Sequence, residues 1–228
     1  FSIAADFKRT FSRECKPYFT GVWDTVSSVG WVWDPVHVPY TARNPDLSIG
    51  RHAVAIDERR CFFRQNLWSR PLPTQDIKQV WFPGVHSDVG GGYPESESGL
   101  AKIALEWMLC EASRAGLLVD RQRAATVLGY AGSHHAAPNE AAVMHNSLTS
   151  VWTLLEPLPH RYVDMSVSPL KTKIKFPFGR RRQIPAGARV HESVEKRMAL
   201  DPGYRPPNLP AARTIEPWIR WPTCGEAV

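Results

Sequence analysis

Apolar residues along the chain fall into short runs and one long periodic segment. Residues 18–23 and 78–85 are aromatic and β-branched runs typical of buried strands, and Pro83 indicates that the second strand ends there. From residue 100 to 115 apolar side chains recur at helical spacing, and Gly116 follows as a helix C-cap. Strands that alternate with loops and a helix predict an α/β fold.

The segments between these elements are less regular. Residues 34–50 and 65–77 are rich in turn-forming residues and are predicted to be loops. Residues 51–64 fit a helix with a strand-like ending at 61–63, so their pattern is ambiguous.

The pattern changes after residue 130. Eleven of the 20 prolines lie in residues 157–228, and only short helices are expected, near 140–155 and 191–199. We therefore divide the chain into an α/β part, residues 1–130, and an irregular, proline-rich, mainly helical appendage packed on it, residues 131–228.

Charge separates the same two parts. The net charge is +6, and residues 1–99 are neutral, so the excess lies in the second half, mostly in the segment 161–189. This segment has no nucleic-acid motif, and we expect no nucleic-acid partner. A solvated basic loop is the simpler interpretation, and contact with an anionic membrane surface is the alternative.

Cysteine is sparse, with four residues and no C-x-x-C pair. The spacing favours thiols in a chain that folds without disulfides. Cys110 is expected to pack within the long helix, and Cys224 to be free. No cysteine has the surroundings of a catalytic nucleophile.

Two ionisable residues directly follow predicted strands. Asp24 follows the first strand and His86 the second, and ligands of open α/β sheets bind beyond the carboxyl ends of strands. A carboxylate that meets an imidazole there would orient it as a general base. The structural alternatives are a turn or capping role for Asp24 and a hydrogen-bonded loop position for His86.

Other candidate chemistry is weaker. His86 and Asp88 could hold a metal, but no further residue has a diagnostic ligand spacing, so we expect neither a metal nor a cofactor. His145 and His191 precede short helical patterns and are expected to cap or to pack. The G-x-S-x-G elbow of a serine hydrolase does not occur in these residues.

Four strings occur in a specific order: GVWDTVSSVG (21–30), AIDERRCFF (55–63), VWFPGVHSDVGGGY (80–93) and LEWMLCEA (105–112). They resemble an α/β-hydrolase family that includes the catalytic domains of bacterial type VI secretion phospholipase effectors. HNSL (145–148) and HESVEKR (191–197) are similar to its later landmarks.

The resemblance implies a Ser–Asp–His triad. Asp24 would be the acid and His86 the base, while Asp88 would be the alternative acid or would hold the His86 loop in shape. The family's serine elbow precedes the GVWDTV motif. We therefore expect residues 1–130 to be the C-terminal part of a hydrolase domain with a partial α/β-hydrolase-like sheet, inactive alone.

Two functions follow from this interpretation. With its serine, the protein would cleave an ester of a lipid or a small molecule, which the residues do not distinguish. The alternative is a non-catalytic remnant or interaction module of the same fold. Sparse cysteine and the lack of a membrane-spanning run in the sequence predict a soluble protein, which would stay in the cytoplasm of a bacterium or be delivered by a secretion system.

Overall fold

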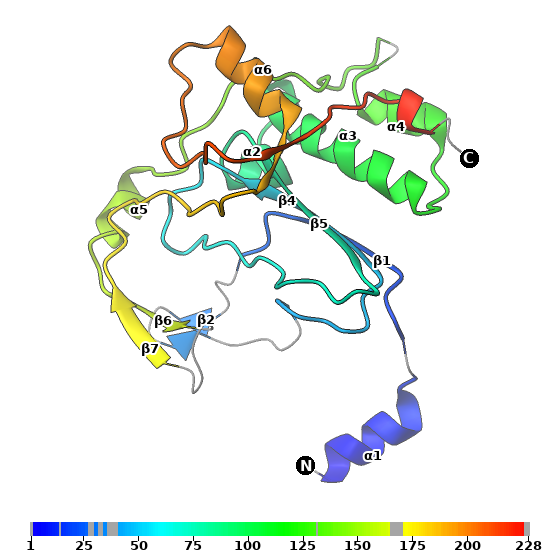
Figure 1. Cartoon of the computed structure of the whole chain (residues 1–228), viewed down its shortest axis with the longest axis vertical. Coiled ribbons are helices and arrows are strands. Elements are labelled where there is room, and N and C mark those ends of the chain that lie inside the picture. The colour runs from blue at the N-terminus through cyan, green and yellow to red at the C-terminus, as the bar shows by residue number, and fades with distance from the viewer. Residues whose placement is uncertain are drawn as a thin grey trace.

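The computed structural model describes residues 2–13, 15–26, 30–31, 34–35, 41–130, 132–164 and 171–225. A five-stranded parallel sheet lies at its centre, in the order β1-β4-β5-β8-β9. Figure 1 labels β1, β4 and β5 of this sheet. Its strands are β1 (Phe19–Trp23), β4 (Ile49–Ala55), β5 (Asp76–Phe82), β8 (Arg189–His191) and β9 (Thr214–Glu216).

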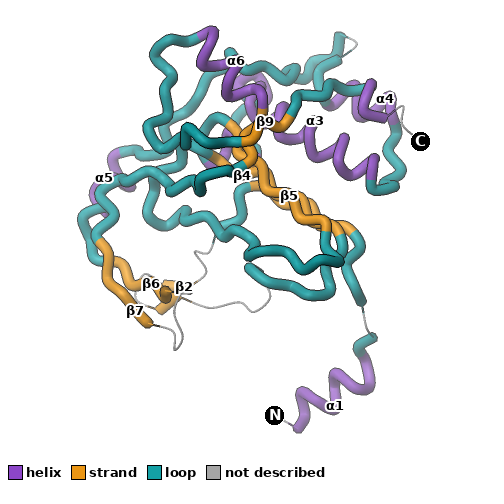
Figure 2. The backbone as a smooth tube through the Cα atoms, in the orientation of Figure 1, coloured by secondary structure: helices purple, strands orange, loops and turns teal. Residues whose placement is uncertain are grey.

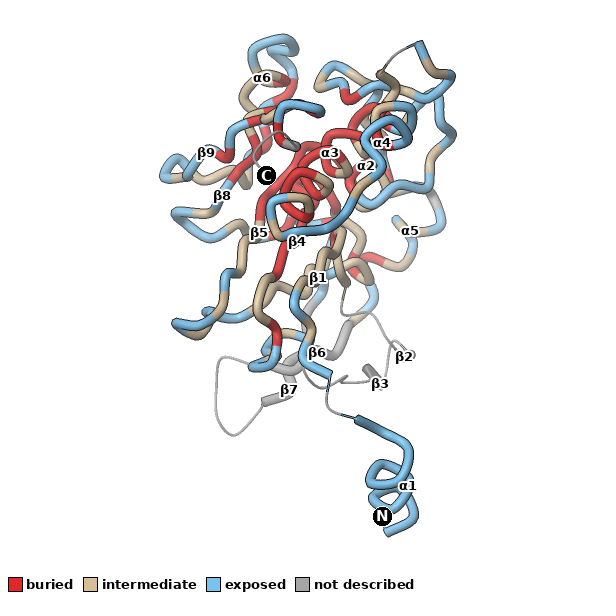
Figure 3. The backbone as a smooth tube through the Cα atoms, turned by 90° about the vertical axis from the view of Figure 1, so that its right-hand side faces the viewer, coloured by how far each residue is buried: buried red, intermediate tan, exposed pale blue. Residues whose placement is uncertain are grey.

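Two helices cover opposite faces of this sheet. Side chains alternate between the two faces along β4 and β5. Ala55 and Phe82 pack with α3 (Gly99–Arg114), while Val54 and Trp81 pack with Val190 and with Val194 of α6 (Glu192–Leu200). Figure 3 shows the buried residues concentrated along β4, β5 and α3. The central strands are buried on both faces, and their apolar runs reflect this.

The remaining elements lie outside this sheet (Figure 2). They are α1 (Ser2–Phe11), β2 (Gly30–Trp31), β3 (Asp34–Pro35), α2 (His86–Gly90), η1 (Glu95–Glu97), α4 (Arg121–Val127), α5 (Ser150–Leu155), β6 (His160–Asp164), β7 (Lys171–Lys175) and η2 (Thr223–Gly225). The helix α1 stands apart from the sheet and has no buried residue (Figure 1).

The structure confirms the α/β character and the long helix. The helix predicted for the ambiguous segment 51–64 was wrong, because residues 49–55 form the strand β4. Because β4 is buried on both faces, its sequence does not alternate between polar and apolar residues. Such a run is compatible with a helix as well as with a strand.

The second half of the chain contributes more strand than expected. Its residues contain β6 to β9 besides α5 and α6, so the description as mainly helical was wrong. The strand β8 pairs with β5, and β9 extends the same sheet. Strands of three residues carry too few side chains for a period to be recognised, which explains the error. The division at residue 130 stays a prediction.

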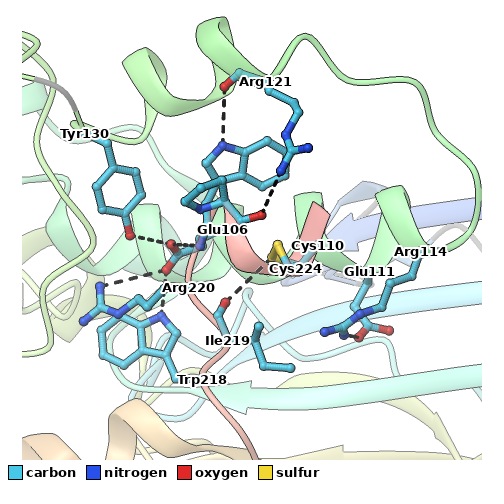
Figure 4. The surroundings of a disulfide bond; sticks show 12 residues. Glu106, Cys110, Glu111, Arg114, Arg121, Tyr130, Trp218, Ile219, Arg220 and Cys224 are labelled. Atoms are coloured by element: carbon cyan, nitrogen blue, oxygen red, sulfur yellow. Dashed lines mark hydrogen bonds and ion pairs between the residues drawn. A yellow bond between two sulfur atoms is a disulfide. The ribbon is translucent and has the colours of Figure 1, made fainter. Parts of the chain in front are cut away.

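A disulfide joins Cys110 of α3 to Cys224 of η2, across 114 residues of sequence (Figure 4). The expectation that the chain folds without disulfides was therefore wrong. The buried Glu106 anchors the same C-terminal segment, accepting hydrogen bonds from the Trp218 indole nitrogen at 2.7 Å and from the Trp221 amide at 2.8 Å. The bond and the carboxylate together hold the end of the described chain against α3.

Candidate active site

The side chains of Asp24 and His86 meet at one edge of the sheet. Asp24 directly follows β1, and His86 begins the helix α2 a few residues after β5. The Oδ2 atom of Asp24 lies 2.6 Å from Nδ1 of His86. Because both strands are parallel members of one sheet, their carboxyl ends bring together residues 62 positions apart.

Asp24 is held in a tight turn at the end of β1. Its φ angle of 39° lies in the left-handed region, which aspartate adopts more readily than most residues. Its amide donates to the carbonyl of Ala53 at 2.7 Å, and its Oδ1 atom accepts the amide of Ala55 at 2.8 Å. These bonds to β4 aim the other carboxylate oxygen at His86.

Arg182 completes the shell around this carboxylate. Its guanidinium donates from Nη1 to Oδ1 of Asp24 at 2.5 Å and from Nη2 to Oδ2 at 3.0 Å, and both side chains are buried. The same guanidinium also binds the carbonyls of Ala55 and Phe63. Burial alone would raise the pKa of Asp24, but the hydrogen bond to His86 and the charge of Arg182 lower it below its ordinary value. The carboxylate is thus ionised.

His86 is held through its backbone amide and through its ring. Its amide donates to Oε2 of Glu58 at 3.1 Å, and its ring packs edge-on against Phe63 at 4.9 Å between centroids. The side chain is 27% exposed. Among the described residues, no hydrogen bond engages Nε2. An imidazole whose Nδ1 meets a carboxylate and whose Nε2 is available has the orientation of a general base.

Two further carboxylates follow β4 and shape the His86 loop. Asp57 accepts the amide of Gly84 at 2.9 Å, and Gly84 has a φ of 110° that favours glycine. Glu58 accepts a hydrogen bond from the Ser147 hydroxyl and two from the Arg60 side chain. Although burial would raise the pKa of Glu58, these arginine contacts lower it. The string AIDERR therefore supports the loop that carries His86.

Asp88 pairs with a different histidine. Its Oδ1 atom lies 2.7 Å from Nδ1 of His145, and its Oδ2 accepts the amide of Val85 at the start of α2. It thereby holds the His86 loop to the segment around His145. Of the two roles proposed for Asp88, these contacts fit the second. Nε2 of His145 lies 2.9 Å from Glu97.

Two other histidines are buried and neutral. His52 of β4 accepts the amide of Thr25 at Nε2, and burial lowers its pKa to about 4. His191 caps α6 by accepting the amide of Ser193, and burial lowers its pKa to about 3. The expected capping role of His191 is confirmed. Burial also raises the pKa of Cys61 to about 12, so this thiol is not a nucleophile at neutral pH.

The sequence analysis missed Arg182 and Glu58. Arg182 lies in the basic run 180–182, where nothing in the local pattern separates it from its exposed neighbour Arg180. Glu58 lies shortly after the end of β4, and that position near a strand end was the available signal. Part of the predicted basic segment thus carries internal ion pairs, and residues 165–170 of it lie outside the described residues.

Residues 2–111 match the model of a family described as the catalytic domain of Tle1-like phospholipase effectors of the type VI secretion system. The match supports the family resemblance that the sequence motifs indicated. The match contains Asp24, His86 and Asp88. Arg182 lies beyond it.

One similar protein is the uncharacterized protein YEL023C of Saccharomyces cerevisiae, which is 43% identical over 74 residues. These residues are 32% of this chain, and the chain covers 11% of the yeast protein. No solved structure is significantly similar. Within the described residues, no helix is long and apolar enough to cross a membrane, and no cluster of three metal-binding side chains occurs.

Proposed function

We propose that this chain supplies the acid and the base of a Ser–Asp–His triad in an enzyme that cleaves lipid esters. The contact between Asp24 and His86 carries the proposal. It joins a buried, ionised carboxylate to a partly exposed imidazole, within the segment that matches the phospholipase family. The serine would come from residues that precede Phe1.

In the proposed reaction, Nε2 of His86 takes the proton from the serine Oγ as this oxygen attacks the ester carbonyl carbon. The intermediate collapses, the carbon–oxygen bond to the alcohol breaks, and Nε2 returns the proton to the leaving oxygen. Water then cleaves the acyl-enzyme by the same steps. Asp24 orients the imidazole and stabilises its positive charge in both halves.

Two surfaces support the proposal that further chain packs beside β1. Among the described strands, β1 pairs with β4 alone, so its other edge is available to an additional strand. The helix α1 carries Ile3, Phe7 and Phe11 at a spacing of four residues, and all three are exposed. A strand and a helical layer that bear the serine elbow would cover both surfaces.

The test is to express the protein together with the sequence that precedes Phe1 and to measure fatty acid release from phosphatidylcholine vesicles. Replacing His86 by alanine is expected to lower the rate at least about a hundredfold. His135→Ala is the matched control, because this exposed histidine pairs only with a surface glutamate among the described contacts. Full activity in the His86 variant would refute the assignment.

The family name suggests delivery by a secretion system, and this remains a prediction. Contact of the segment 161–189 with an anionic membrane is also a prediction, to which Arg181 and Arg182 contribute little because they bind Asp57 and Asp24. The exposed Arg180 is a better candidate for such contact.

A further inference from the structure

An apolar hollow of about 380 Å³ opens beside the candidate site. Its lining consists of Val26, Phe62, Phe63, Trp152 and Leu155, all of them apolar or aromatic. This volume lies at the lower end of the range of roughly 300–1,000 Å³ for small-molecule pockets. It therefore suits one flexible chain better than a whole lipid.

The hollow adjoins His86 through Phe63, which lines the hollow and contacts the imidazole ring. The Phe63 ring packs edge-on against both the His86 ring and the Trp152 ring, with centroid distances of 4.9 and 5.6 Å. The carbonyl of Phe63 accepts a hydrogen bond from Arg182, and the guanidinium of Arg60 lies 3.4 Å from its ring centroid. Phe63 is thus a fixed wall between the imidazole and the hollow.

The helix α5 forms one side of the hollow and is apolar on both of its sides. Trp152 and Leu155 line the hollow, while Val151 and Leu154 face outward and are 69% and 75% exposed. A solvent-facing helix normally presents polar residues on its outer side. Outward apolar residues beside a pocket are typical of contact with a lipid surface.

We propose that this hollow binds the acyl chain of the lipid substrate, and that Val151 and Leu154 contact the membrane from which the lipid comes. Binding of the chain does not require the proposed function, but cleavage of the bound lipid rests on it. With the ester carbonyl beside Nε2 of His86, the chain would run along Phe63 and end between Trp152 and Leu155.

The proposal predicts a dependence on chain length. Each methylene that enters an apolar hollow improves affinity about fourfold until the hollow is full. Affinity should therefore rise along a series of alkylphosphocholines from hexyl to decyl, kept below their micelle-forming concentrations. Isothermal titration calorimetry on the whole chain measures this without any serine.

Two pairs of variants test the two surfaces separately. Leu155→Gln places an amide in the wall and is expected to weaken alkyl binding roughly tenfold, while Leu154→Gln, on the outer side of the same helix, leaves it unchanged. In flotation with neutral phosphatidylcholine vesicles, Leu154→Gln is expected to reduce binding roughly tenfold. Leu118→Gln is the control there, since Leu118 is 97% exposed on the loop after α3.

A variant that fills the hollow separates a loss of binding from a loss of folding. Leu155→Trp keeps the wall apolar and reduces the volume, so that longer chains should bind no better than hexyl. An unchanged chain-length dependence in this folded variant would overturn the proposal for the hollow. The proposal for the membrane contact would be overturned if Leu154→Gln lost self-association and kept its binding to vesicles. His86→Ala should retain alkyl binding, so a failure of catalysis is distinguishable from a failure of the hollow.

Discussion

Replacing Arg182 by methionine is expected to destabilise the protein and to alter its acid sensitivity. The guanidinium makes two hydrogen bonds to Asp24 and also binds the carbonyls of Ala55 and Phe63. Methionine has a similar length but offers no donor. The variant therefore leaves a buried carboxylate that keeps only its contacts with Ala55 and His86.

The magnitude follows from the burial of both partners, whose side chains are 4% and 0% exposed. Breaking a buried ion pair by removing one member costs about 3–5 kcal/mol. This is a large share of a total stability of roughly 5–15 kcal/mol. Arg180→Met is the matched control, because Arg180 is exposed two positions earlier, and such a change costs within about 0.5 kcal/mol.

The pH dependence gives an independent readout. Because the pKa of Asp24 is lowered in the folded protein, its contribution to stability is present above the unfolded pKa of about 3.8 and is lost as pH falls through the folded value. Without Arg182, burial raises the pKa of Asp24 with less opposition, so the loss of stability on acidification should begin at a higher pH.

Urea unfolding between neutral and acidic pH measures both effects. A loss below about 1 kcal/mol for Arg182→Met, with an acid profile like that of Arg180→Met, would refute the reasoning. It would place the pair in the class of exposed ion pairs, which contribute little.

Three further changes have defined outcomes. Cys224→Ser should lower the free energy of unfolding by roughly 4–5 kcal/mol, because the bond to Cys110 closes a loop of 114 residues; equal urea midpoints with and without reductant would contradict this. Lowering the pH from 7 to 5.5 should reduce the free energy of unfolding by about 1 kcal/mol through His191, because its pKa of about 3 in the folded protein lies below the ordinary 6.5 and the unfolded state is protonated first. His191→Asn should keep the cap of α6, and urea unfolding of this variant should lack this part of the pH dependence. Asp88→Asn should lower the raised pKa of His145, measured by NMR titration of its ring, and an unchanged value would show that Glu97 alone sustains it.

Local pattern was informative where an element carries its own period or cap. The helix at 99–114 and the strands before Asp24 and His86 have enough residues to show such a pattern. The position after a strand end also indicated that Asp24 and His86 could meet, because parallel strands bring their carboxyl ends to one edge.

Long-range pairing was not predictable from the sequence. Arg182 is 158 residues from Asp24, and Cys224 is 114 residues from Cys110. A run of three arginines has the same local composition whether its members face water or a buried carboxylate. The pairing depends on the packing of the second half of the chain against the sheet, which no local pattern encodes.

The candidate site depends on both halves of the chain. Asp24 and His86 come from the segment that matches the phospholipase family, but the charge that offsets the burial of Asp24 comes from Arg182, beyond that segment. The same arginine fixes the carbonyl of Phe63, whose ring separates His86 from the apolar hollow. One guanidinium thus contacts both Asp24, the proposed acid, and Phe63, the proposed acyl-binding wall. A change that displaces residues 180–182 should therefore affect catalysis and chain binding together, whereas a change in α5 should affect binding alone.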